Sequence, residues 1–164
     1  MTKLISIIGR SNSGKTTIIT RLIPLFCNSG IKVGTIKNTH HSVEFDQPGK
    51  DSFKHKMAGS EQVMLLSGDS FAIYGENEKK LNLKQLVSTY FKGFDLVISE
   101  GFKNEMCLKI EVNRSANKKT PLYLNPVYEV QAVISDEEPK LDIKHFYLDE
   151  IEDIYNWIKT SLHI

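Results

Sequence analysis

Cysteine and long hydrophobic runs are scarce in this sequence of 164 residues. The two cysteines, Cys27 and Cys107, lack metal-ligand spacing and lie in apolar stretches, so we interpret both as reduced core residues. No apolar run approaches the roughly 20 residues that span a bilayer. The N-terminus runs directly into a short strand-like segment without the pattern of a signal peptide. We therefore expect a cytoplasmic protein with no membrane partner.

An excess of charge of either sign is also missing. The chain has 21 basic and 20 acidic residues, a net charge of +1, so no overall field attracts it to nucleic acid. Any anion site must be local. Only three residues are arginines, namely Arg10, Arg21 and Arg114. With 40% hydrophobic and 25% charged residues, the composition is that of a globular protein, and the length predicts one domain over residues 1–164.

The order of hydrophobic patterns predicts an α/β fold. Leu4 to Ile8 is a buried strand, and a helix with an i, i+4 apolar series follows from Lys15 to near Ser29. A second strand over 31–36 completes a βαβ unit with parallel strands. Further on, we expect a short helix through Met57, a hairpin over 62–66 and 70–74, and a helix over 83–90. Strands are expected over 94–99, 108–112 and 130–135. The final helix is expected to begin at Asp149, with a capping box between Asp149 and Glu152. The pattern is typical of a three-layer P-loop NTPase fold with a mainly parallel sheet and an inserted β-hairpin.

The segment from Gly9 to Thr16 carries the clearest motif, G-x-x-x-x-G-K-[ST], between the first strand and the first helix. Glycines let the backbone N–H groups converge on phosphate oxygens, and the helix N-terminus adds partial positive charge. Lys15 is expected to reach the β and γ phosphates, and the Thr16 hydroxyl to ligate Mg²⁺. The predicted nucleotide-binding residues of this loop are Gly9, Ser11, Asn12, Ser13, Gly14, Lys15, Thr16 and Thr17. A purine nucleoside triphosphate is the expected ligand.

A second acidic group should hold the metal's water shell from the carboxyl end of a neighbouring strand. The segment from Phe94 to Gly101 offers Asp95 and Glu100. Asp95 opens the strand and points to the wrong edge of the sheet, whereas Glu100 ends it on the phosphate side. We therefore predict Thr16 and Glu100 as the Mg²⁺ residues.

A long polar loop, residues 38–52, begins at the end of the second strand and contains His40, His41, Asp46, Lys50 and Asp51. These side chains could sense the γ-phosphate, order a hydrolytic water or contact a second ligand. Asp46 and Asp51 are the catalytic candidates. The alternative is a solvated polar loop without a chemical role.

Several blocks of residues together resemble the MobB family, the molybdopterin-guanine dinucleotide biosynthesis protein B. The blocks are Gly9 to Thr17, Ile36 to His41, Gln47 to Ser52, Ala58-Gly59, Glu100 to Lys103 and Ala132 to Asp136. The resemblance implies a homodimeric, GTP-binding accessory protein with weak Mg²⁺-dependent GTPase activity. It also implies action with the MobA guanylyltransferase in making the guanine dinucleotide form of the molybdenum cofactor, and a pterin cofactor is a candidate second ligand. The family typically has histidine where Asn38 stands.

Guanine recognition needs a separate candidate, because the N-K-x-D element that reads guanine in many GTPases is absent. Asn117-Lys118-Lys119-Thr120 lacks the aspartate. Asp136 ends an apolar strand on the nucleotide edge, and its carboxylate could accept from the guanine N1–H and amino group, a donor pair that adenine lacks. An ordinary loop aspartate is the competing interpretation.

Two other functions fit a P-loop. A small-metabolite kinase would need arginines to clamp the transferring phosphoryl group, and this chain offers only Arg114 outside the P-loop and first helix. A metallochaperone NTPase would use His40, His41 and nearby acids, but no Cys-x-x-Cys or histidine run accompanies them.

Overall fold

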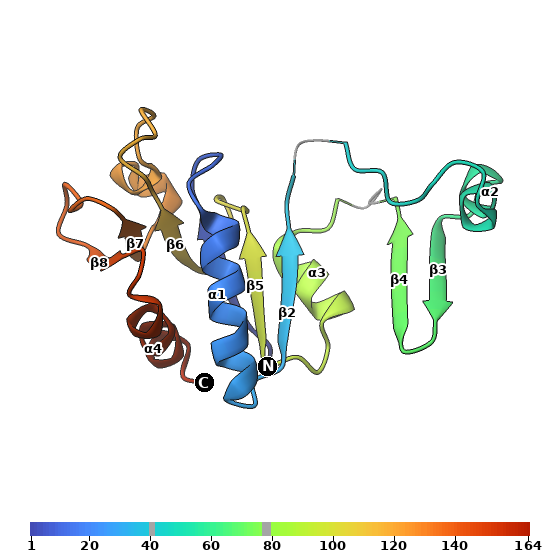
Figure 1. Cartoon of the computed structure of the whole chain (residues 1–164), viewed down its shortest axis with the longest axis horizontal. Coiled ribbons are helices and arrows are strands. Elements are labelled where there is room, and N and C mark those ends of the chain that lie inside the picture. Colours follow the sequence, from blue (N-terminus) through green and yellow to red (C-terminus); the bar gives the residue numbers. More distant parts are fainter. Residues whose placement is uncertain (40–41, 77–79) are drawn as a thin grey trace. The chain divides into compact units, whose positions relative to one another are not determined.

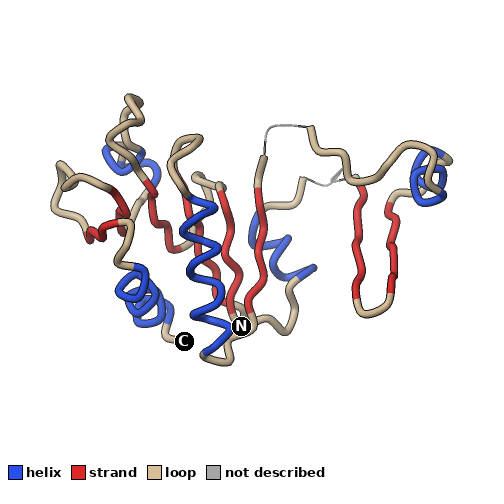
Figure 2. The backbone as a smooth tube through the Cα atoms, in the orientation of Figure 1, coloured by secondary structure: helices blue, strands red, loops and turns tan. Residues whose placement is uncertain are grey.

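The computed structural model describes residues 1–39, 42–76 and 80–164, so His40 and His41 lie outside the described residues. Its contacts divide the chain into two compact units, one comprising Met1–Asn38 and Asn82–Ile164, the other Thr39–Leu81. Figures 1 and 2 show the elements of each unit. No helix within the described ranges combines the length and hydrophobicity that a membrane span requires.

The first unit is built on a six-stranded, parallel sheet with strand order β2-β5-β1-β6-β7-β8. The strands are β1 (Lys3–Ile8), β2 (Val33–Lys37), β5 (Leu96–Glu100), β6 (Leu108–Val112), β7 (Ala132–Ser135) and β8 (Lys144–Tyr147). The helical elements are α1 (Lys15–Asn28), α3 (Leu83–Tyr90), α4 (Ile151–Leu162) and the 3-10 turns η1 (Leu122–Leu124) and η2 (Pro126–Tyr128). The prediction of an α/β fold with a parallel sheet is confirmed.

Helices cover both faces of this sheet. On one face, α1 and α4 bury Leu22, Phe26, Ile154 and Ile158 against the sheet, and Ile98 of β5 faces them. On the other face, Leu83 and Val87 of α3 pack on Val97, the neighbour of Ile98 along the same strand. Successive side chains of a strand point to opposite faces, so one buried strand serves two hydrophobic cores. The result is the expected three-layer arrangement (Figure 1).

The second unit contains α2 (Asp51–Met57) and a two-stranded antiparallel sheet of β3 (Gln62–Ser67) and β4 (Ser70–Gly75). The hairpin lies where the turn residues Ser67 to Asp69 predict it. Within the unit, the Tyr74 hydroxyl donates a hydrogen bond to the Asp46 carboxylate, which ties the preceding loop to β4.

The structure differs from the sequence-based predictions at three places. Cys27 is exposed on α1 rather than buried, because it occupies a solvent-facing position of that helix, although both cysteines are free as expected. The capping box at Asp149 does not form: α4 begins at Ile151, and no side chain in the described part of the chain caps it. Strand β8 was not predicted, because it has only four residues, of which Lys144 and Tyr147 are exposed.

Candidate nucleotide site

The P-loop lies between β1 and α1 at the carboxyl end of the sheet's central strand. Its backbone needs left-handed conformations, with a φ of 145° at Gly9 and 98° at Gly14. A Cβ on Gly9 would lie 2.3 Å from the Val112 carbonyl oxygen, which a side chain cannot tolerate. Gly9 is therefore required both for the curl of the loop and for its close approach to β6.

The start of α1 is open toward the loop. Its N-cap is Gly14, no side chain of the described residues caps the helix, and its first turn contains no acidic residue. By contrast, Asn82 caps α3 through a reciprocal hydrogen-bond pair with Gln85. Uncapped N–H groups and the helix dipole favour an anion at this end of α1.

Ser13 gives a second sign of a ligand in the loop. Its hydroxyl oxygen is buried and has no hydrogen-bond partner among the residues that the structure describes. A buried hydroxyl without a partner costs free energy, and phosphate oxygens are the acceptors that a P-loop brings to such a group. The orphaned hydroxyl of Ser13 therefore fits a bound phosphate. Ser11 and Asn12, by contrast, are exposed, and Asn12 adopts a φ of 61°.

Lys15 folds back on its own loop, where its Nζ donates to the carbonyl oxygen of Arg10 at 2.9 Å. Burial lowers the pKa of the Lys15 amine, while the nearby Glu100 carboxylate acts in the opposite direction. The ammonium group is thus held at the mouth of the loop by one weak neutral acceptor. It is available for exchange onto a phosphate oxygen, for which a charged acceptor makes the stronger bond.

Glu100 lies opposite Thr16, as the strand register predicts. The Thr16 hydroxyl donates to Glu100 Oε2 at 2.9 Å, and Lys37 Nζ lies 3.5 Å from Oε1. A hydroxyl and a carboxylate are hard oxygen ligands suited to Mg²⁺, which keeps several waters and needs only one or two protein groups. The predicted pair Thr16 and Glu100 therefore fits a Mg²⁺ ion.

Asp95 lies at the other end of β5. Its carboxylate accepts a hydrogen bond from the Lys32 main-chain N–H at 2.8 Å, just before β2 begins. The prediction that Asp95 belongs to the edge away from the phosphate loop is confirmed.

Asp46 and Asp51 belong to the second unit. The carboxylate of Asp46 accepts from the Tyr74 hydroxyl and from the Gln47 N–H, and the Tyr74 hydrogen bond is the main cause that lowers its pKa. Asp51 is the first residue of α2, and its carboxylate lies 2.9 Å from the Lys54 ammonium. Their assignment as catalytic residues stays a prediction.

Asp136 follows β7, as expected for a residue on the nucleotide edge of the sheet. Its carboxylate accepts two hydrogen bonds from Ser115, from the main-chain N–H at 2.7 Å and from the hydroxyl at 3.1 Å. The first of these hydrogen bonds is the main cause that lowers its pKa. Asp136 thus joins the loop after β7 to the loop after β6, a use that the sequence did not suggest.

Comparison with known proteins gives consistent results. Residues 4–136 match the family model described as Molybdopterin guanine dinucleotide synthesis protein B. The molybdopterin-guanine dinucleotide biosynthesis adapter protein of Escherichia coli (strain K12) is 35% identical over 161 residues, which cover 96% of this chain and 92% of that protein. The adapter protein of Haemophilus influenzae (strain ATCC 51907 / DSM 11121 / KW20 / Rd) is 37% identical over 98% of this chain and 89% of its own length.

Solved structures share the architecture. A crystal structure of molybdopterin-guanine biosynthesis protein B superposes with a TM-score of 0.79 at 29% identity, covering 97% of this chain and 99% of that one. The Bacillus subtilis MobB structure superposes with a TM-score of 0.77 at 21% identity over 98% of both chains, and supports the fold alone.

Proposed function

Because the chain belongs to the molybdopterin guanine dinucleotide synthesis protein B family, we propose that it is a GTP-binding adapter protein in the biosynthesis of that dinucleotide. GTP and Mg²⁺ bind at the P-loop, and hydrolysis there is slow. The observation that supports the proposal best is the hydrogen bond from Thr16 to Glu100, placed beside Lys15 and the orphaned hydroxyl of Ser13.

Each residue of the site has a separate task in this proposal. The Lys15 ammonium leaves the Arg10 carbonyl for the β and γ phosphates, and the Ser13 hydroxyl donates to a phosphate oxygen. The Thr16 hydroxyl and the Glu100 carboxylate, which bond to each other in this structure, would hold the Mg²⁺ ion through their oxygen atoms. A bound Mg²⁺ ion would neutralise part of the negative charge of the phosphates.

The position of Arg114 agrees with slow hydrolysis of the bound nucleotide. Arg114 is the arginine nearest to Gly14, but its Nε donates to the Ser13 carbonyl oxygen at 3.3 Å. To stabilise a transferring phosphoryl group, Arg114 would have to give up this hydrogen bond or turn its remaining N–H groups away from the loop backbone. We therefore propose an adapter whose nucleotide controls binding to a partner, rather than an enzyme of high turnover.

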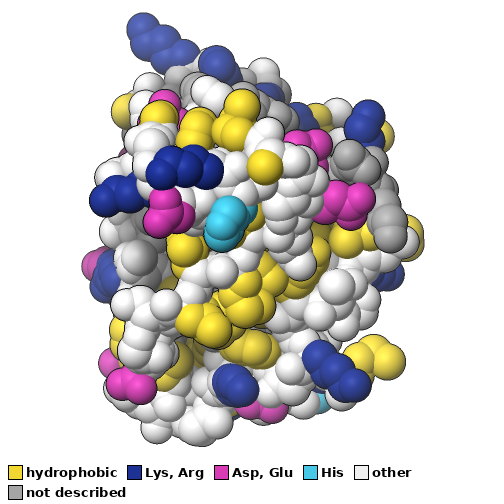
Figure 3. Space-filling view, turned by 90° about the vertical axis from the view of Figure 1, so that its right-hand side faces the viewer, with side chains coloured by type: hydrophobic (Ala, Val, Ile, Leu, Met, Phe, Trp, Pro, Cys, Tyr) yellow, Lys and Arg dark blue, Asp and Glu magenta, His cyan; other side chains and the backbone are white. Residues whose placement is uncertain are grey.

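The proposed partners are a MobA-type guanylyltransferase, a molybdopterin ligand and a second copy of this chain. For the second copy, the hairpin offers one apolar face, on which Met64 lies opposite Ile73 and Leu66 opposite Phe71. All four side chains are exposed. Figure 3 shows hydrophobic side chains gathered in the middle of the face that it draws. An exposed apolar face on a two-stranded sheet with open edges is typical of a surface that another chain covers.

The experiment that tests the proposal is a calorimetric titration of the purified protein with non-hydrolysable GTP and ATP analogues, with Mg²⁺ and with a chelator. We expect saturable binding of the GTP analogue that weakens in the chelator. Addition of the protein with GTP to a guanylyltransferase of the pathway should then increase formation of the dinucleotide. Absence of Mg²⁺-dependent triphosphate binding would contradict the proposal.

A further inference from the structure

A cavity of about 320 Å³ lies beside the P-loop in the first unit. Residues from two loops line it, the loop 113–121 after β6 and the loop 135–140 after β7. Its size is at the lower end of the range for small-molecule sites, enough for a heterocyclic base. Both loops leave the carboxyl ends of parallel strands, where ligands of open α/β sheets bind.

The cavity wall is tied to the P-loop by two arginines. Arg10 of the P-loop donates from Nε and Nη2 to the Thr120 carbonyl oxygen, at 3.3 and 3.0 Å. From the opposite direction, Arg114 of the cavity wall donates to the Ser13 carbonyl oxygen. A nucleotide with its phosphates on the P-loop therefore has an adjoining compartment in which its base can lie.

Three successive acids, Asp136, Glu137 and Glu138, follow β7, and two of them are engaged by the protein. Both carboxylate oxygens of Asp136 accept from Ser115, and Asp136 is not among the residues that line the cavity. Glu138 accepts from the Tyr147 hydroxyl at 2.9 Å, and its other oxygen lies 3.5 Å from His145 Nδ1. These two acids hold the loop in place.

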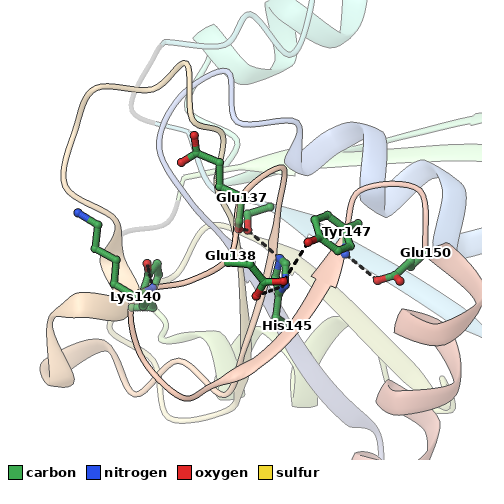
Figure 4. Close-up of polar contacts among 8 residues, drawn as sticks. Glu137, Glu138, Lys140, His145, Tyr147 and Glu150 are labelled. Atoms are coloured by element: carbon green, nitrogen blue, oxygen red, sulfur yellow. Dashed lines mark hydrogen bonds and ion pairs between the residues drawn. The ribbon is translucent and has the colours of Figure 1, made fainter.

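Glu137 differs from its neighbours. Like Glu138 it lines the cavity, but its carboxylate has no hydrogen bond or ion pair with any residue in the described part of the chain. In Figure 4 this carboxylate points away from the cluster of Glu138, His145 and Tyr147. The main chain of Glu137 is nevertheless fixed, because the Ser135 hydroxyl donates to its carbonyl oxygen and His145 Nε2 lies 3.0 Å from that hydroxyl.

We infer that the guanine base of the bound nucleotide lies in this cavity and that Glu137, rather than Asp136, reads it. The inference deepens the proposed GTP binding and rests on it. Guanine presents its N1–H and its 2-amino group side by side, and one carboxylate accepts from both. Adenine presents an acceptor at N1 instead, which a carboxylate repels. Lys118, Lys119 and Lys140 also line the cavity and bring positive charge to its walls.

The test is the Glu137→Gln variant, because an amide offers one acceptor and one donor. That pair matches xanthine, which has an N1–H but a carbonyl oxygen where guanine has its amino group. We expect the GTP-to-ATP affinity ratio to fall about 10- to 100-fold, and affinity for xanthosine triphosphate to rise. A gain in binding cannot come from misfolding. The matched variant Asp136→Asn should lower affinity for GTP and ATP by similar factors, leaving their ratio unchanged.

The possible results separate this inference from the function on which it rests. If the wild-type protein binds GTP and ATP through Lys15, but only Asp136→Asn changes their ratio, the assignment of Glu137 is wrong and GTP binding stands. An unchanged GTP-to-ATP affinity ratio in both variants also contradicts the assignment of Glu137. If the wild-type protein binds no triphosphate at all, both the inference and the nucleotide-binding proposal fail. Equal wild-type affinities for GTP and ATP would overturn guanine reading alone.

Discussion

The hydroxyl group of Thr16 donates a hydrogen bond to the carboxylate of Glu100 across 2.9 Å, and so links the first turn of α1 to the last residue of β5. The two residues are 84 positions apart in the sequence. They meet because β1 and β5 are parallel neighbours, in register from Lys3 opposite Leu96 to Ile7 opposite Glu100. The register thus brings a hydroxyl and a carboxylate to the mouth of the P-loop.

This relationship predicts unequal effects for two conservative changes in one strand region. Glu100→Gln should weaken Mg²⁺-dependent GTP binding about 10- to 100-fold, because the variant lacks the negative charge that would hold the ion beside Thr16. Asp95→Asn should change it little, since Asp95 binds the Lys32 N–H at the other end of β5. Titration at several Mg²⁺ concentrations checks both, and a larger effect of Asp95→Asn would contradict the Mg²⁺ assignment.

Removal of the P-loop lysine should abolish triphosphate binding and spare the fold. In Lys15→Ala we expect a loss of affinity of at least about 100-fold, because several charge-assisted hydrogen bonds to phosphate disappear. The amine bonds only to the Arg10 carbonyl oxygen among the described residues, so the unfolding midpoint should stay close to that of the wild type. Lys92→Ala, at an exposed position, serves as the control. Wild-type affinity in a folded Lys15→Ala protein would rule out the P-loop as the site.

Much of this site follows from the sequence, because P-loop geometry depends on local spacing. The glycine positions, Lys15 and Thr16 are read directly from the motif, and Glu100 from its place at the end of an apolar run. The engagement of Asp136 by Ser115 could not be read in this way, since it depends on how two loops fold against each other. Between the adjacent acids Asp136 and Glu137, only the three-dimensional contacts distinguish a loop clamp from a free carboxylate.

The fold, like the site, could be predicted from the sequence only in part. Strong periodicity and the Ser67 to Asp69 turn were enough to predict α1 and the hairpin. The short edge strand β8 and the exact start of α4 were not readable, because four residues carry little hydrophobic pattern and because a local hydrogen bond competes with the predicted cap. The Glu150 side chain, for example, accepts from the Tyr147 main-chain N–H at 2.7 Å instead of leaving Asp149 and Glu152 to form a capping box.

The two acids of the second unit provide a test of the loop before α2. If Asp46 and Asp51 act on the γ-phosphate, their change to asparagine should lower GTP turnover while GDP affinity stays as in the wild type. If this loop serves a second ligand instead, turnover should persist, while His41→Ala and Lys50→Ala impair cofactor maturation with the guanylyltransferase. Single-turnover hydrolysis and a maturation assay distinguish the two cases. Wild-type results in both assays would indicate a solvated loop.

A buried carboxylate should dominate the stability of the cavity wall. Glu111 is fully buried in β6 and accepts from the main-chain N–H groups of Leu122 and Tyr123, at 2.8 and 2.7 Å. Glu111→Ala removes both acceptors and should cost about 1–3 kcal/mol of unfolding free energy, measured by urea denaturation. Glu44→Ala, at an exposed position, should have no measurable effect.

The same residue predicts a pH dependence. Burial raises the pKa of the Glu111 carboxyl, so the folded state keeps its proton to a higher pH than the unfolded state. The stability that Glu111 contributes is therefore largest below the ordinary glutamate pKa and declines as the pH rises through the raised value of the folded state. This decline should be absent from the Glu111→Ala variant. An identical slope in both proteins would assign the pH dependence to other groups.

The hairpin of β3 and β4 has a consequence for how the second unit holds its structure. A two-stranded sheet with Met64, Leu66, Phe71 and Ile73 exposed on one face is at best marginally stable in water. If the proposed second copy covers that face, mass action couples the local unfolding of the strands to association. Amide hydrogen exchange in β3 and β4 then slows as protein concentration rises, whereas exchange in β1 and β5 is insensitive to dilution.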